Sequence, residues 1–130
     1  MAYLDAADPE HDEVAACLDG FAGRLCTTNA VATEAMQLLQ RHPQGPAALA
    51  QFAEAAPLEV YDAAQPDVLA ACALLMDRYS DTPMDYADAT LVLLADRVSV
   101  YEILTLDRRG FRTYRAARKR RFRLVLDDPS

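Results

Sequence analysis

Histidine, glycine and cysteine are scarce in this 130-residue chain, and each scarcity removes a class of chemistry. With only His11 and His42, at a helix start and in a loop, no Ser-His-Asp or Cys-His nucleophilic arrangement is supported. Four glycines leave no glycine-rich loop that could cradle phosphate. Cys17, Cys26 and Cys72 are odd in number, far apart and in apolar surroundings. We therefore expect reduced thiols in the core, not a disulfide or zinc framework.

Long hydrophobic runs are also missing. The apolar runs are shorter than the roughly 18 to 20 residues that span a bilayer, and no basic stretch precedes an apolar one at the N-terminus. We therefore expect a cytoplasmic protein. A chain of this length that is 52% hydrophobic predicts a single domain, residues 1–130, with a genuine core.

Basic residues are rare until late in the chain, which has a net charge of -7. Residues 1–107 hold 4 of them against 18 acidic residues, whereas residues 108–123 hold eight arginines and Lys119 with no acid. The chain is thus an acidic body with a basic strip, residues 108–123. The strip could contact phosphates, or it could be a solvated surface loop that balances nearby acids, and charge alone leaves both open.

Hydrophobic periodicity and capping residues predict helices that alternate with short strands. The expected helices cover about 8–21, 29–41, 47–56, 66–79 and 85–98. The expected strands cover 25–27, 58–61, 102–106 and 122–126, the last after the basic loop. This order predicts an α/β fold whose mainly parallel sheet is covered on both faces. Unusually for such a fold, a helix and not a strand comes first.

Four acidic residues fall where such a sheet forms its sites. Asp85 and Asp88 are three apart in the first turn of one helix, and Asp107 follows the strand over 102–106. Glu34 lies in the helix after the strand over 25–27. Sites in open α/β sheets form at the carboxyl ends of strands, where carboxylates would repel each other unless a cation intervened. Mg²⁺ or Mn²⁺ suits such an all-oxygen shell and would polarise a phosphodiester.

Each acid also has an ordinary structural explanation. Asp85, after Pro83-Met84, is a good helix N-cap, and Asp88 could simply favour the helix dipole. Glu34 could be an exposed helical glutamate, and Asp107 could belong to a turn. No single acid is decisive alone.

Four segments together resemble the PIN-domain ribonucleases of the VapC-like toxin type. They are YLDAADPEH (3–11), TTNAVATE (27–34), DTPMDYADA (81–89) and LTLDRRGF (104–111). Each segment is weak alone, but their order and spacing cover nearly the whole chain. The resemblance implies a PIN-like three-layer α/β/α sandwich with a mainly parallel, short-stranded sheet.

The resemblance further implies a Mg²⁺- or Mn²⁺-dependent endoribonuclease that is usually a homodimer and is held inactive by a cognate antitoxin. Glu34, Asp88 and Asp107 would then be the catalytic acids and metal ligands, with Asp85 an accessory ligand or cap. Thr105 would lie near the metal or its waters. Three basic residues would hold RNA phosphates or an acidic stretch of antitoxin, namely Arg108, Arg109 and Arg112.

This chain also departs from the family pattern. Family members begin with a strand that is central in the sheet and ends in the first catalytic acid, and this sequence resumes the pattern only at Ala2. We expect that strand and acid to be missing, either because Met1 marks a start placed too late in the reading frame or because this is a truncated, silent copy. Gly110 stands where relatives often carry another aspartate. The alternative function is therefore a PIN-fold module that binds RNA or an antitoxin without cleavage.

Overall fold

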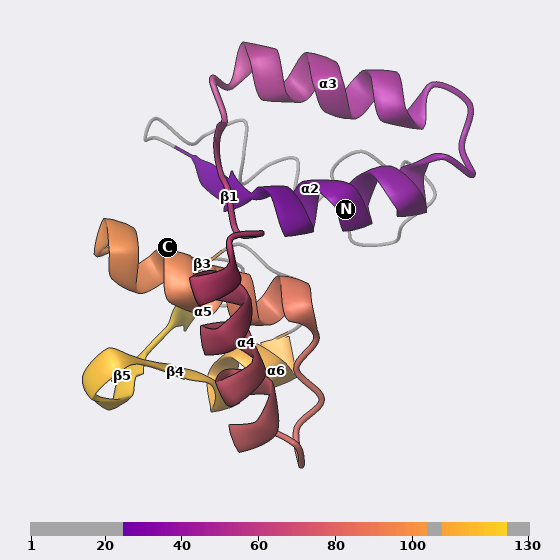
Figure 1. Ribbon diagram of the computed structural model, residues 1–130. Helices are drawn as coiled ribbons and strands as arrows, with labels where there is room; N and C mark the ends of the chain where they lie inside the picture. The colour runs from indigo at the N-terminus through magenta and orange to yellow at the C-terminus, as the bar shows by residue number, and fades with distance from the viewer. Residues whose placement is uncertain (1–24, 104–107, 125–130) are drawn as a thin grey trace.

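The computed structural model describes residues 25–103 and 108–124 (Figure 1). The helices are α2 (Asn29–Leu39), α3 (Gly45–Ala55), α4 (Pro66–Arg78), α5 (Tyr86–Val98) and α6 (Arg108–Thr113), with a short 3-10 turn η1 (Ala117–Lys119). The strands are β1 (Cys26–Thr28), β2 (Glu59–Tyr61), β3 (Glu102–Ile103), β4 (Arg115–Ala116), β5 (Arg120–Arg121) and β6 (Arg123–Leu124). The helix expected over 8–21, and Cys17 within it, lie outside the described residues.

The strands pair over short distances. β1 runs parallel to β2, with Cys26 opposite Glu59 and Thr28 opposite Tyr61, and β3 runs parallel to β6. β4 and β5 form an antiparallel hairpin. The α/β class with short parallel strands is confirmed. Within 25–103 and 108–124 the strands form three separate pairs, not one continuous sheet.

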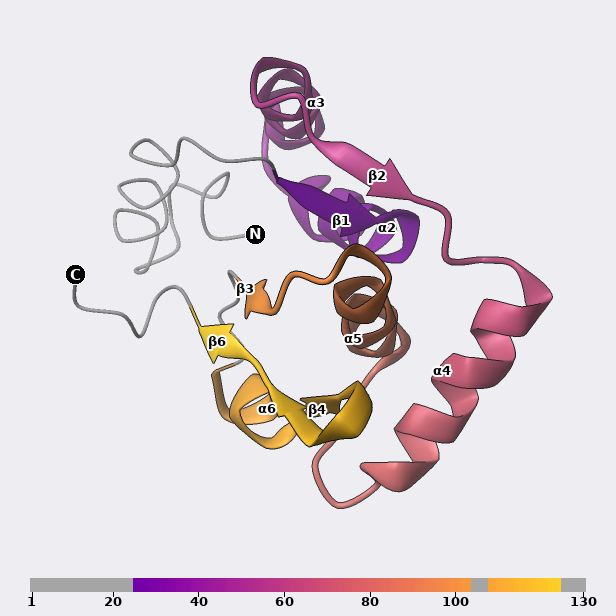
Figure 2. The ribbon, with the colours of Figure 1, turned by 90° about the vertical axis from the view of Figure 1, so that its left-hand side faces the viewer.

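Helix α5 lies at the centre of the molecule, between the β1–β2 pair and the segment of β4 and β6, with α4 beside it (Figure 2). Because other elements pack around α5, it needs apolar residues on several of its faces. The residues that it buries are Ala89, Thr90, Val92, Leu94 and Ala95. A smaller cluster of Ala35, Leu39 and Leu49 joins α2 to α3. No helix in the described part of the chain is long and apolar enough to cross a membrane.

The basic strip is more ordered than the loop expected for it, so that expectation was wrong. It folds into α6, the β4–β5 hairpin and β6. Phe111, Tyr114 and Phe122 are buried between its cations, and Phe111 packs edge-on against Tyr114 at 5.0 Å and Phe122 at 5.4 Å between ring centroids. Burial of the three aromatic rings holds the strip against the core while most of its described arginines stay exposed.

The expectation of buried thiols holds for one described cysteine and fails for the other. Cys72 is buried in α4, but Cys26 is exposed. Cys26 shares a strand face with Thr28, but only Thr28, whose hydroxyl contacts Thr90 of α5, is buried. In a strand of only three residues, the alternation of side chains between the two faces does not by itself predict which residues are buried.

Candidate active site

The carboxyl end of β1 passes directly into α2 through a capping threonine. The Thr28 hydroxyl accepts a hydrogen bond from the Val31 backbone N–H at 3.3 Å, so Thr28 is the N-cap of α2. This turn directs α2 away from the strand end. Glu34 then lies in the second turn of α2, with an exposed side chain.

The start of α5 is fixed by a reciprocal pair of aspartates. The Asp85 carboxylate accepts from the Asp88 backbone N–H at 2.8 Å, and the Asp88 carboxylate accepts from the Asp85 backbone N–H at 3.2 Å. This capping box satisfies two donors that a helix start leaves without partners. The capping role considered for Asp85 is therefore confirmed. Asp88 is half-buried, and its carboxylate is held in a fixed orientation at the helix start.

Two buried threonines tie these two helix starts together. The Thr28 and Thr90 hydroxyl oxygens are 2.8 Å apart, and the two residues are 2% and 1% exposed. Thr90 donates its hydrogen to the Ala87 carbonyl at 2.7 Å, so Thr28 must be the donor in the bond between them. The chain of bonds from the Val31 N–H through both hydroxyls to the Ala87 carbonyl leaves no buried polar atom of the pair unsatisfied. It fixes the position of α2 relative to α5.

Electrostatics show that Glu34 and Asp85 belong to the same region. Desolvation by neighbouring atoms raises the pKa of Glu34 above its ordinary value of 4.5, and the negative charge of Asp85 raises it further. Two carboxylates from α2 and α5 therefore repel each other across this junction. Such repulsion between oxygen donors is what a bound cation would relieve.

A second polar network, which sequence reasoning missed, lies beside this junction. Asn29 accepts from the Ala63 backbone N–H at 2.9 Å and donates to the Asp62 carboxylate at 3.3 Å. Hydrogen bonds from the Gln65 side chain, the Ala64 backbone and Asn29 lower the pKa of Asp62 below its ordinary value. Asp62 directly follows β2, so the rule that singled out Asp107 after its strand would also have found it.

Tyr86, the first residue of α5, extends this network to the acidic junction. Its hydroxyl donates to the Ala63 carbonyl, and burial raises its pKa. The side chain therefore holds the loop after β2 against the start of α5. Polar residues at the ends of both β1 and β2 thus form hydrogen bonds in the same part of the structure, beside the start of α5.

The structure places the other predicted site residues only in part. Asp107 and Thr105 lie outside the described residues. Arg108 and Arg109 belong to α6, but their side chains are not described, and Arg112 is exposed on the same helix. Across 25–103 and 108–124, no three His, Cys, Asp or Glu side chains come close enough to hold a metal ion. The charge of Asp85 acts on Glu34, and Asp85 and Asp88 are hydrogen-bonded to each other.

The structure defines a small α/β protein. Its acidic side chains lie at the end of a parallel strand pair and at the start of the central helix. The chain matches no protein-family model. Over 127 residues it is 35% identical to Ribonuclease VapC26 of Mycobacterium tuberculosis (strain ATCC 25618 / H37Rv), and the alignment covers 96% of this chain and 93% of that protein. The chain therefore belongs to the VapC-like PIN-domain family, and the resemblance seen in its four segments is confirmed.

Proposed function

We propose that this chain is a divalent-metal-dependent endoribonuclease, the toxin of a type II toxin-antitoxin pair. The observation that carries the proposal is the capping box at the start of α5, which fixes the Asp85 and Asp88 carboxylates; the charge of Asp85 also helps to raise the pKa of Glu34 on α2. The similarity to a protein named as a ribonuclease supports RNA as the substrate. An acidic junction in a ribonuclease relative is best explained as a metal site.

The donor chemistry of the junction fits Mg²⁺ or Mn²⁺. All the groups concerned are carboxylates, which are the ligands that these hard cations prefer. We assign Glu34, Asp88 and Asp107 as the principal ligands and catalytic acids, with Asp85 as a supporting ligand and Thr105 near them. A bound cation would supply Lewis acidity at the scissile phosphate.

The residues of the chain have distinct tasks in this proposal. The Asp85–Asp88 capping box holds the Asp88 carboxylate in a fixed orientation, which lowers the entropic cost of forming the site. The Thr28–Thr90 bond keeps α2, and thus Glu34, in position beside α5. On α6, three cations would neutralise RNA phosphates or bind an acidic stretch of antitoxin, namely Arg108, Arg109 and Arg112.

The proposed partners are RNA, a cognate antitoxin and a second copy of the chain, in the cytoplasm. Exposed apolar side chains support a protein partner, because large apolar groups at the surface commonly mark interaction sites. On α4, Leu69 is 47% and Leu74 is 72% exposed, and on α2 Leu38 is 47% exposed. Exposed apolar side chains of this kind are stabilised when a partner covers them.

The proposal is tested by RNA cleavage with wild-type chain and Asp88→Asn. The substrates are transfer RNA, ribosomal RNA and a pool of single-stranded RNA of random sequence. We expect cleavage in Mg²⁺ or Mn²⁺ that stops in EDTA and falls at least about a hundredfold in Asp88→Asn, because a ligand and its fixed charge are lost.

The matched control is Asp77→Asn, because Asp77 is exposed on α4 and outside the acidic junction. This variant should cleave RNA like the wild type. Cleavage that persists in EDTA or in Asp88→Asn would contradict the proposal. Complete absence of cleavage by the wild-type chain would also contradict it, and would favour the binding module without activity.

A further inference from the structure

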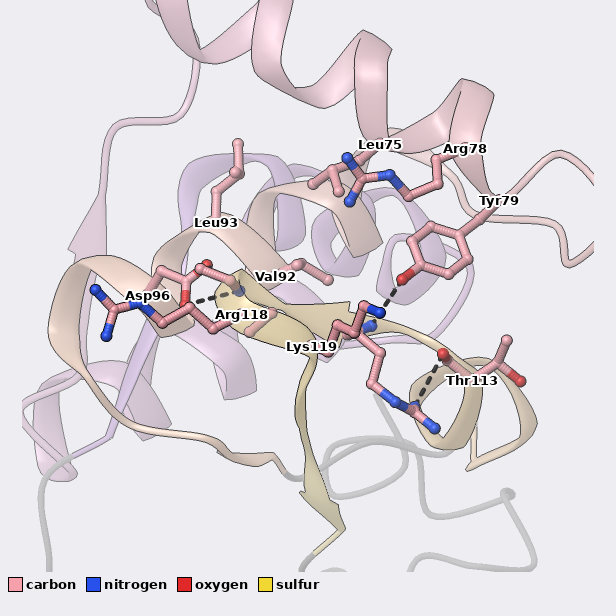
Figure 3. Close-up of a pocket in the computed structure, with 12 residues that line it drawn as sticks. Leu75, Arg78, Tyr79, Val92, Leu93, Asp96, Thr113, Arg118 and Lys119 are labelled. Carbon is pink, nitrogen blue, oxygen red and sulfur yellow. Dashed lines mark hydrogen bonds between the residues drawn. The ribbon is translucent and has the colours of Figure 1, made fainter.

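A groove lies away from the acidic junction, against the carboxyl half of α5 (Figure 3). Its volume is about 860 Å³. Leu75 from α4 and Val92 and Leu93 from α5 line its apolar part, and Tyr79 forms one wall. The opposite side is formed by the basic strip, from Thr113 through β4 to the turn η1.

Three cations surround this groove. Arg78 comes from the end of α4, and Arg118 and Lys119 come from η1. Among the described residues, none of the three forms an ion pair with a carboxylate. Arg115 is different, because its guanidinium donates to the backbone carbonyls at the end of α6 at 2.6 to 2.9 Å.

The one acid that lines the groove has a structural task. The Asp96 carboxylate accepts from the Ala117 backbone N–H at 3.0 Å and from the Tyr101 hydroxyl at 3.1 Å. It therefore anchors η1 against α5. The side chains of Arg118 and Lys119 extend from this anchored turn.

The backbone of the turn places its two cations at positive φ angles. Arg118 and Lys119 have φ angles of 59° and 60°, in the left-handed region. Glycine and asparagine adopt this region most easily, and hairpin turns usually use them there. Two long basic side chains are less favourable at such positions, so asparagine should be tolerated at both.

We propose that this groove binds the backbone of single-stranded RNA outside the cleaved bond, an inference that rests on the proposed ribonuclease function. The charge distribution favours this occupant. The chain has a net charge of -7, and its proposed cleavage site is built of carboxylates, so the site itself repels RNA. Attraction must come from cations elsewhere, and the groove brings three of them around the partly exposed side chains of Leu93 and Tyr79.

The position of the groove sets the length of RNA that can reach it. Asp88 and Asp96 are eight residues apart on α5, which corresponds to roughly 12 Å along the helix axis. A nucleic acid strand rises roughly 3.4 Å per nucleotide along a duplex axis, and an extended single strand covers more, so at most about four nucleotides bridge this distance. A single phosphate therefore cannot occupy the cleavage site and the groove at once, whereas a longer RNA can.

The test measures RNA binding in EDTA, where metal-dependent cleavage cannot interfere. Fluorescence anisotropy follows labelled single-stranded RNAs of about 20 and about 2 nucleotides, the shorter of which offers one phosphate between its nucleotides. The test variant is Arg118→Asn with Lys119→Asn, because asparagine tolerates a positive φ and the variant should fold at least as well as the wild type. We expect binding of the longer RNA to weaken by about tenfold or more, with a smaller change for the shorter RNA, which can make at most one of the two lost phosphate contacts.

Two controls distinguish an effect of the groove residues from a general effect of the net charge of the chain. Arg118→Lys with Lys119→Arg keeps the charge and should keep the affinity. Arg41→Asn with Arg121→Asn removes two exposed cations that do not line the groove, and should have a clearly smaller effect. Loss of two phosphate contacts should also reduce the slope of log affinity against log salt by about 1.4 for the groove variant.

The outcomes distinguish this inference from the proposed function. If the wild type cleaves RNA but the groove variant binds the longer RNA normally, the inference is wrong and the function stands. If the groove variant loses binding although no cleavage is found, the inference stands and the function fails. Binding of a poly-glutamate peptide that depends on Arg118 and Lys119, with no effect on RNA, would show that the groove takes an acidic peptide and would overturn the inference.

Discussion

Glu34 is a carboxylate whose negative charge is disfavoured by its surroundings. Desolvation raises its pKa first, and the charge of Asp85 raises it further. A raised pKa means that the folded chain holds this proton more tightly than the unfolded chain does. The stability gained from it is therefore complete below the ordinary pKa of 4.5 and is lost as the pH rises through the folded value. At neutral pH the ionised side chain therefore lowers the stability of the chain without metal.

We therefore expect Glu34→Gln to have opposite effects with and without metal. Without metal at neutral pH, its melting temperature should rise by about a degree or two, because repulsion from Asp85 is removed, and the gain should vanish near pH 4. With Mn²⁺ present, the variant should gain much less stability than the wild type, because a ligand is lost. Thermal unfolding with and without MnCl₂ at both pH values measures both effects.

The control for this experiment is Glu54→Gln. Glu54 is exposed on α3, outside the acidic junction, so its removal should leave the Mn²⁺ effect unchanged. A Glu34→Gln chain that keeps the full Mn²⁺ stabilisation would show that Glu34 is not a ligand.

At the scale of elements, the bond between Thr28 and Thr90 joins residues 62 positions apart in the chain. It connects the end of β1 and the start of α2 to the first turns of α5, which carry the acids. The bond is buried, so each hydroxyl depends on the other for its hydrogen bonding. The geometry of the acidic junction therefore depends on two side chains that are not acidic.

We expect Thr90→Val to reduce the free energy of unfolding by about 1 to 3 kcal/mol, because the Thr28 hydroxyl would remain buried without its acceptor. Thr28→Val should cost a similar amount and also remove the cap of α2. The double variant should cost clearly less than the sum of both, since neither partner is then left alone. Urea unfolding of the three variants measures the coupling, and simple additivity would show that the two hydroxyls act independently.

For the molecule as a whole, the features predicted well were those that depend on neighbouring residues. The starts of α2 and α5 follow capping residues, Thr28 and Asp85, and their lengths follow the apolar periodicity. The α/β class follows from the order of these elements. The helix starts that carry Glu34 and Asp88 were therefore accessible from the sequence.

The features that were missed depend on contacts between distant segments. The basic strip was expected to be a loop because its charges hide the spacing of Phe111, Tyr114 and Phe122, which pack into the core. The role of Asn29 depends on Ala63, which lies 34 residues later. The metal-ligand roles of Glu34, Asp85, Asp88 and Asp107 stay predictions, and Asp107 lies outside the described residues.

The central claim is that a divalent cation held by these acids acts on the RNA phosphate at the cleaved bond. The most direct measurement uses RNA in which one non-bridging oxygen of that phosphate is replaced by sulfur, with each of the two isomers tested separately. Mg²⁺ binds sulfur poorly and Mn²⁺ binds it better, so for one isomer we expect cleavage to slow by about tenfold or more in Mg²⁺ and to recover in Mn²⁺. Equal slowing in both metals for both isomers would contradict the account.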